Sequence, residues 1–269
     1  MRARSSRNVW LTAWLCAVCV VMAAPAGAQA PGASPPEARA LLLKMGTLLG
    51  STERLSVTVH AAYDAVQPSG LKIEWNEVRK LTLHRPGRLR MEAEKSNGAR
   101  SLVLFDGKQI STFDEAARAY AQAAQPGGID ETLVYFVRDL GMRLPLAVLF
   151  VSRVAADLER RVKSVEYVEK TGIFGAAAHH LVGKTDSVDF QVWIADGERP
   201  LPQRIVLTYP AAAGQPEFRA QFSAWNLAAE APDTLFAFTP PDGASKIPFA
   251  AALPRYGAAT GATKKGPKP

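Results

Sequence analysis

The sequence predicts a mainly β protein (α+β) of about eleven short antiparallel strands, with helices at its start and in its middle. Apolar and polar residues alternate, as around Leu81, Leu83 and Leu89, which is typical of strands with one buried face. Turn-forming pairs such as Asp106-Gly107 separate these segments at short intervals. Two further segments repeat apolar residues at helical spacing. This combination favours a sandwich, a barrel or a strongly curved sheet, with the central helices on the concave side.

Residues 1–28 are expected to be a cleaved secretory signal peptide rather than part of the fold. Three arginines precede an apolar run over 9–23, and Ala26-Gly27-Ala28 has the small-residue pattern of a cleavage site. The alternative is a transmembrane anchor, but the apolar run is too short for one. Both cysteines, Cys16 and Cys19, lie in this segment, so the mature chain is expected to have no disulfide and no cysteine metal site.

The mature chain is expected to consist of one domain over 29–250 and a disordered basic tail over 251–269. The tail is rich in Gly, Ala, Lys and Pro and cannot bury enough apolar surface to fold. The formal net charge of +7 includes the three arginines of the signal peptide, which leaves +4. This mild excess on an exported protein argues against a nucleic-acid partner. No stable membrane span is expected after cleavage.

The first predicted helix begins with Ser34 as its cap and runs to about residue 49, where Gly50 is expected to end it. A first group of strands follows over 55–63, 71–75, 81–94, 101–114 and 116–124, and Arg85-Pro86-Gly87 breaks the third of these segments.

The central helical zone is expected to begin with Asp130 as a cap, and a short apolar segment over 145–151 and a charged helix over 154–162 follow. Five strands are then predicted over 165–171, 177–184, 188–195, 203–209 and 217–225, with a short final element over 233–238.

Nothing in the sequence specifies an active site. His179 and His180 are adjacent on a predicted strand and point to opposite faces, so the pair is not expected to bind a metal. The nucleophile-elbow, zinc-protease and phosphate-loop motifs are absent from the sequence. We therefore predict no catalytic residue, no metal and no cofactor, with an enzyme of unknown type as a remaining alternative.

Three short motifs indicate a family. Arg85-Pro86, Asp106-Gly107-Lys108 and FAFTPPDGASKI at 236–247 occur in the order found in the LolA-type lipoprotein carriers (LolA/LolB-like), and the resemblance extends over about 36–247. Those carriers are periplasmic proteins of Gram-negative bacteria, and this chain is most similar to a LolA-like family of unassigned function. The resemblance implies an incomplete, strongly curved antiparallel β-barrel with helices as a lid over an apolar cavity. It also implies that Arg85 hydrogen-bonds the lid and keeps it shut.

The resemblance and the alternation together predict a cavity and its cover. One concave wall is expected to carry Ile73, Trp75, Leu83, Leu89, Met91, Leu104, Phe190, Val192, Phe218 and Phe222. The lid is expected to carry Leu133, Phe136, Val137, Leu140, Leu146 and Phe150. For any single member of the wall, an ordinary core position is the alternative.

These expectations predict a periplasmic, non-catalytic protein that binds a hydrophobic ligand, such as an acyl chain, a lipid or the lipid moiety of a lipoprotein. Apolar cavities that stay open take apolar ligands. The alternative is a sensor or interaction module that uses the same fold to bind a protein partner in the envelope.

Overall fold

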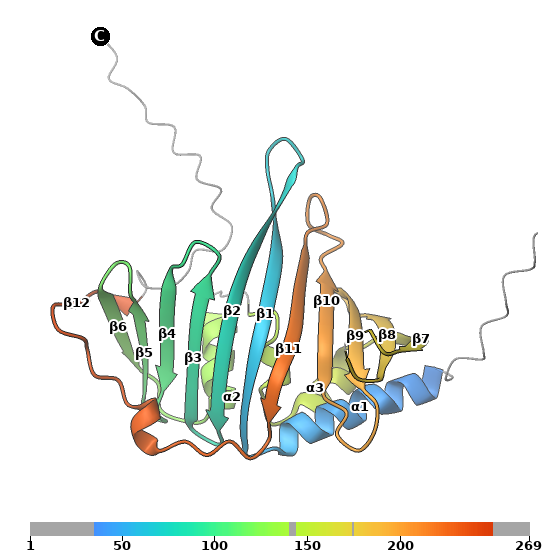
Figure 1. Cartoon of the computed structure of the whole chain (residues 1–269), viewed down its shortest axis with the longest axis horizontal. Coiled ribbons are helices and arrows are strands. Elements are labelled where there is room, and N and C mark those ends of the chain that lie inside the picture. The colour runs from blue at the N-terminus through green and yellow to red at the C-terminus, as the bar shows by residue number, and fades with distance from the viewer. Residues whose placement is uncertain (1–34, 140–143, 174, 250–269) are drawn as a thin grey trace, which may run out of the picture. The chain divides into compact units, whose positions relative to one another are not determined.

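One continuous sheet of twelve strands forms the body of the protein in a computed structural model that describes residues 35–139, 144–173 and 175–249 (Figure 1). The strand order is β12-β6-β5-β4-β3-β2-β1-β11-β10-β9-β8-β7. The first six strands are β1 (Arg54–Val66), β2 (Lys72–His84), β3 (Arg88–Lys95), β4 (Arg100–Phe105), β5 (Gln109–Asp114) and β6 (Ala119–Ala124). The others are β7 (Ser164–Thr171), β8 (Ala178–Lys184), β9 (Asp189–Ala195), β10 (Pro202–Thr208), β11 (Glu217–Asn226) and β12 (Ser245–Lys246).

The sheet consists of two runs of sequential hairpins that join where β1 pairs with β11. All pairings are antiparallel except that of the two-residue strand β12 with β6. The mainly β, antiparallel prediction is therefore confirmed, with one short strand more than expected. The predicted strong curvature is wrong, because the sheet is neither closed nor strongly curled. Alternation determines which face a residue occupies, but it does not determine how far the sheet bends.

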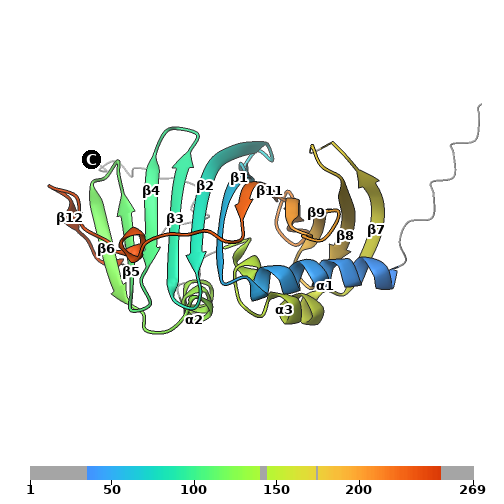
Figure 2. The ribbon, with the colours of Figure 1, turned by 60° about the horizontal axis from the view of Figure 1, so that its bottom comes forward.

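Three helices lie against one face of this sheet (Figure 2). They are α1 (Pro35–Ser51), α2 (Ile129–Val134) and α3 (Val154–Arg161). The π-helical turn η1 (Tyr135–Asp139) continues α2, and the single turn η2 (Ala147–Leu149) precedes α3. A last turn, η3 (Asp233–Phe236), lies between β11 and β12.

Two glycines of α1 allow α3 and its approach to pack directly against it. A side chain at Gly46 would meet the Ala155 backbone at 3.0 Å, and one at Gly50 would collide with the Ser152 carbonyl oxygen. The helix therefore runs past Gly50 to Ser51, and the prediction that this glycine ends the helix is wrong. The absence of a side chain at Gly50 allows close packing and does not end the helix.

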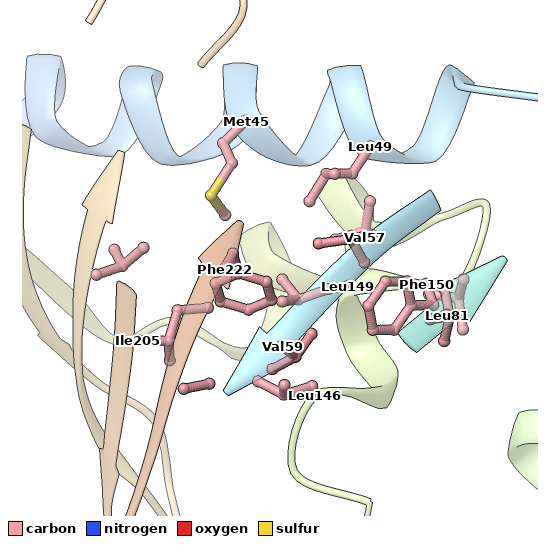
Figure 3. Packing of buried hydrophobic residues seen from close by; sticks show 14 of the residues in the cluster. Met45, Leu49, Val57, Val59, Leu81, Leu146, Leu149, Phe150, Ile205 and Phe222 are labelled. Atoms are coloured by element: carbon pink, nitrogen blue, oxygen red, sulfur yellow. The ribbon is translucent and has the colours of Figure 1, made fainter. Parts of the chain in front are cut away.

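The core fills the space between the helices and the sheet. Val57 of β1 points toward Leu49 of α1, and Val59 lies beside Leu146 of the central segment (Figure 3). These side chains are almost completely buried. The face of the sheet that the sequence predicted to be apolar is thus the face that the helices cover.

The start of α2 differs in detail from the prediction. Gly128, rather than Asp130, is the N-cap residue, and its backbone N–H donates to Oε2 of Glu131 in the first turn at 2.8 Å. Leu140, Ser34, the signal peptide over 1–28 and the tail over 251–269 lie outside the described residues. Within the described ranges, no helix is both long and apolar enough to cross a membrane.

Candidate functional site

Two hollows lie on opposite faces of the sheet. The helix-side pocket, of about 380 Å³, lies between the sheet at β9, β10 and the β8–β9 turn and the helical layer of α1, α3 and the turn before α3. Its described lining is mostly apolar and comprises Leu42, Met45, Pro145, Leu146, Val148, Leu149, Leu158, Arg161, Val162, Thr185, Asp186, Ser187, Val188, Phe190, Val192, Ile205 and Leu207. The open-face trough is larger, at about 1090 Å³, and charged side chains line much of it.

Strand register builds the floor of the helix-side pocket. Phe190 pairs with Leu207 and Val192 pairs with Ile205 across β9 and β10, so all four side chains share one face. On the other side Phe190 pairs with Gly183 of β8, where any side chain would collide with the Phe190 ring. Gly183 thus leaves room for the phenyl ring to lie across β8 and extend the apolar floor.

The roof of the pocket comes from three separate segments. Leu42 and Met45 of α1 are buried, because the helical stripe that carries them faces the sheet. Leu146 and Leu149 come from the turn before α3, and the half-buried Leu158 comes from α3 itself. Movement of the helical layer would therefore change the shape of the pocket.

Polar groups gather at the mouth, where α3 ends and the β8–β9 turn begins. Arg161 and Asp186 are the charged residues of the described lining, and both are exposed. Asp186 is paired with Lys163, whose Nζ lies 3.2 Å from Asp186 Oδ1. Within the described residues, the Arg161 side chain makes no hydrogen bond and no ion pair.

Arg85 connects the sheet to the end of α1, to α2 and to the segment before α3. Its Nε donates to the Thr52 carbonyl at 3.1 Å, and its Nη2 lies 3.4 Å from the carbonyl oxygens of both Leu49 and Val151. Its Nη1 lies 3.8 Å from Asp130 Oδ1. A cation at the C-terminal end of α1 also complements the helix dipole.

The burial of Arg85 changes the pKa of its guanidinium group. Desolvation lowers the pKa of the Arg85 guanidinium, and the charge of Asp130 opposes that shift. Asp130 in turn accepts hydrogen bonds from the Ser152 backbone at 2.9 Å and from the Ser152 hydroxyl at 2.6 Å. Asp130 thereby joins α2 to the segment that leads into α3.

The two short motifs around Arg85 lie side by side. A side chain at Gly87 would meet Gly107 Cα at 3.2 Å, and Arg88 donates to the carbonyl of Asp106. The backbone N–H of Ile129 donates to the Pro86 carbonyl at 2.7 Å, so α2 begins on the Arg-Pro turn. The turn therefore fixes the start of α2 as well as the end of α1.

The open-face trough carries paired charges. Arg90 pairs with Glu92 at 2.6 Å, and Arg219 lies 2.8 Å from Asp64 Oδ1. Burial raises the pKa of Asp64, but hydrogen bonds from Arg219 and from the Glu217 backbone outweigh it and lower the pKa below its ordinary value. The hydrogen bond to Asp64 raises the pKa of Arg219. Such a surface favours water and polar groups over an acyl chain.

The structure distributes the predicted wall and lid residues between the pocket and the closed core. Phe190, Val192 and Leu146 line the helix-side pocket. The other members that belong to the packed cluster beneath the helices are Leu83, Leu89, Met91, Leu133, Phe136, Phe150, Phe218 and Phe222. The cavity predicted along the whole wall is therefore restricted to the β8–β10 end, since core side chains occupy the remainder.

Four predicted residues lie elsewhere. Leu104 pairs with Arg90 and lies on the opposite face, because the register that matches Leu89 with Phe105 shifts the parity in β4. Ile73 and Trp75 are 43% and 45% exposed, since the β1–β2 hairpin extends beyond its neighbours (Figure 1). Val137, in the π-helical turn, is 46% exposed.

Most of the pocket lining was not predicted from the sequence, since of its described residues only Phe190, Val192 and Leu146 belong to the predicted wall and lid. Leu42 and Met45 of α1 and Ile205 and Leu207 of β10 were not assigned to the site. The alternation that found Phe190 and Val192 applies equally to Ile205 and Leu207. Arg161 and Asp186 carried no sequence signal, because their position at the mouth depends on how α3 meets the β8–β9 turn.

A row of titratable groups lies at the outer strands, away from the pocket. His179 bridges the Tyr167 hydroxyl, 3.2 Å from Nδ1, and Asp196 Oδ1, 2.9 Å from Nε2. Burial raises the pKa of Tyr167, which makes its hydroxyl a poorer nucleophile. Lys170 and His179 lower the pKa of Asp196 to about 2. His180 stacks on Trp193 with ring centroids 4.0 Å apart.

The row therefore resembles a structural network more than an activated site. Among the described residues, no group of three or more His, Cys, Asp or Glu side chains could hold a metal ion.

The chain is similar to one protein family and to solved structures of low sequence identity. A family described as "Predicted periplasmic protein (DUF2092)" matches residues 38–250. No curated protein matches the chain. Similar solved structures include the Mycobacterium tuberculosis lipoprotein LppX, at 13% identity and a TM-score of 0.47, covering 73% of this chain and 99% of that one.

Two further structures are a Pseudomonas aeruginosa MucA/MucB complex and a LolA superfamily protein from Nitrosomonas europaea. The first shows 19% identity and a TM-score of 0.40, covering 75% of this chain and 61% of that one. The second shows 13% identity and a TM-score of 0.35, covering 75% and 97%.

Proposed function

The chain belongs to the DUF2092 family of predicted periplasmic proteins, and from that premise we propose that it is a non-catalytic carrier or binding protein for an acyl chain. The ligand would be a lipid or the lipid moiety of a lipoprotein. It would occupy the helix-side pocket. No cofactor or metal takes part in this proposal.

The observation that supports this proposal is the lining of the pocket. Its floor of Phe190, Val192, Ile205 and Leu207 and its roof of leucines and Met45 offer an acyl chain an almost wholly apolar surface. Burial of such a chain is worth about 0.8 kcal/mol per methylene group. A volume of about 380 Å³ lies within the range of roughly 300–1,000 Å³ that is usual for ligand sites.

Arg85 is proposed to act as the latch of this site. It binds the C-terminal end of α1 and Val151 in the segment before α3, and the roof residues Met45 and Leu149 lie in the same two segments. Ligand entry would require these segments to move away from β9 and β10. The hydrogen bonds of Arg85 oppose that movement, so the latch would set the balance between a closed empty form and an open loaded form.

A pocket-filling substitution tests the proposal. Leu207→Trp should occupy the volume without adding a charge, so a fluorescent fatty acid that binds the wild-type protein should bind this variant at least tenfold more weakly. Leu102→Trp places the same ring in the open-face trough and should leave affinity unchanged. Native mass spectrometry of protein from the periplasm should find lipid on the wild type. If the wild type neither carries lipid nor binds the probe, the proposal is wrong.

A second candidate function is an interaction module for a protein partner. The supporting observation is an exposed apolar strip on the protruding hairpin, formed by Leu71, Ile73 and Trp75, of which Leu71 is 71% exposed. A photo-crosslinking side chain at Ile73 should then yield one discrete protein adduct in the periplasm. The same group at Val168 on β7, which is 41% exposed, serves as the control and should yield none. Equal labelling at both sites would remove this candidate.

A further inference from the structure

The mouth of the helix-side pocket carries charged side chains, whereas its interior is apolar. Arg161 is the last residue of α3 and lines the pocket, yet it has no ion-pair or hydrogen-bond partner within the described ranges. The neighbouring arginine is different, because Arg160 pairs with Asp157 at 2.6 Å. Arg153 also approaches Asp157, at 3.6 Å. Asp157, one of the two acidic residues of α3, is thus already paired with two other arginines.

The other charged group of the lining does not cancel Arg161. Asp186 is held by Lys163 across the mouth, with 3.2 Å between the charged atoms. Thr185 is likewise engaged, because its hydroxyl accepts the backbone N–H of Val188 at 3.0 Å. The mouth therefore presents one uncompensated guanidinium beside an apolar interior.

We propose that the helix-side pocket takes a single acyl chain with an anionic head group, which the Arg161 guanidinium binds at the mouth. This inference rests on the proposed function and adds the chemical class of the ligand. A guanidinium matches a carboxylate or a phosphate in a bidentate geometry, which a neutral head group cannot reproduce. A volume of about 380 Å³, near the lower end of the usual range of roughly 300–1,000 Å³, suits one chain better than two.

The position of Arg161 also explains how the head group would stay hydrated. The residue is exposed, so the anion would remain in contact with water while the chain is buried. No charge would have to enter the apolar interior, which avoids the large desolvation cost of a buried ion. Fatty acids and phosphate-bearing single-chain lipids share this chemistry.

Binding of three ligands with the same sixteen-carbon chain tests the inference on the full mature protein: palmitate, hexadecyl phosphate and neutral hexadecanol. We expect both anions to bind about tenfold or more tightly than the alcohol, as a hydrogen bond to a charged group predicts. In Arg161→Gln this preference should disappear while the affinity for hexadecanol stays the same. The matched control is Arg160→Gln, which removes the same charge from the same helix end outside the pocket lining and should keep the preference.

The outcomes separate the two proposals. If all three ligands bind equally and Arg161→Gln changes nothing, the anionic head group is wrong although the acyl pocket stands. If none of them binds, the acyl pocket and the head-group inference both fail. If the anions are preferred, the tighter of palmitate and hexadecyl phosphate identifies a fatty acid or a lipid phosphate as the source.

Discussion

The two faces of the sheet share the same strands but have opposite chemistry. On β11, Phe218 and Phe222 point to the helices, whereas Arg219 and Gln221 point to the open-face trough. The volume of the trough is nearly three times that of the helix-side pocket, but paired charges line the trough. The smaller hollow is the better ligand site for an acyl chain. The chemistry of the lining, rather than the volume, therefore decides which hollow can take an apolar ligand.

Substitutions at two neighbouring residues of β11 should show the largest difference in stability between the two faces of the sheet. Phe222→Ala removes a buried ring of β11 that lies below Met45 of α1 and beside Leu149, and should lower the free energy of unfolding by about 3–5 kcal/mol. Gln221→Ala, on the trough side of the same strand, should change it by less than about 0.5 kcal/mol. Urea denaturation measures both. Similar losses for the two variants would contradict the assignment of the faces.

The next effect concerns the latch. Arg85→Leu removes the donors that hold α1 to the sheet without opening a void, and should cost about 1.5–3 kcal/mol of closed-state stability. Because the closed form then competes less well with ligand, fatty acid should bind more tightly and dissociate more slowly in stopped-flow measurements. The control is Arg54→Leu, an exposed arginine of β1. Unchanged affinity in a folded Arg85→Leu variant would refute the latch.

The stability that Asp64 contributes on the trough side of the sheet should depend on pH. The pKa of Asp64 is lower in the folded protein than the value of about 3.9 expected when unfolded. Asp64 therefore contributes stability above about pH 4, and this contribution is lost as the pH falls through the folded pKa. Asp64→Asn should lower the Tm at neutral pH, and the difference from wild type should shrink toward pH 2. A constant difference across that range would show that the charge of Asp64 is not responsible.

The smallest effect is expected at the exposed ion pairs of the trough. Arg100 and Glu94 lie 3.1 Å apart and are both more than half exposed. Arg100→Gln should change stability by less than about 1 kcal/mol and should leave fatty-acid affinity unchanged. Isothermal titration calorimetry would detect an effect on binding. Any clear loss of affinity would mean that the trough takes part in ligand binding.

The faces were predictable from the sequence, because alternation in β9 and β11 determines which side chains share a side. The order of three short motifs predicted a periplasmic protein, in agreement with the description of the family that matches the chain. The misplacement of Leu104 shows the limit of parity, since a turn between two strands can shift it and only the register of β3 with β4 reveals the result. Ile73 and Trp75 kept the predicted alternation, but it does not show how far the helices extend along β2.

The site was only partly predictable, for a related physical reason. Phe190 and Val192 followed from a local pattern, whereas the roof of the pocket depends on how α3 packs against α1, where Gly46 and Gly50 allow a close approach. Arg161 at the mouth depends on that contact. Arg85 was found through its motif, but its acceptors on Leu49, Thr52 and Val151 are backbone carbonyls, which carry no side-chain signal in the sequence.

The most direct test compares one substitution on each face. Leu207→Asp places a carboxylate in the helix-side pocket, and Leu102→Asp places one in the open-face trough. A fluorescent fatty acid, displaced by palmitate, reports binding to each folded variant. We predict that Leu207→Asp abolishes binding, because the carboxylate is costly to desolvate beside an acyl chain, whereas Leu102→Asp retains the wild-type affinity. Loss of binding in Leu102→Asp with full affinity in Leu207→Asp would contradict the account and place the ligand on the open face.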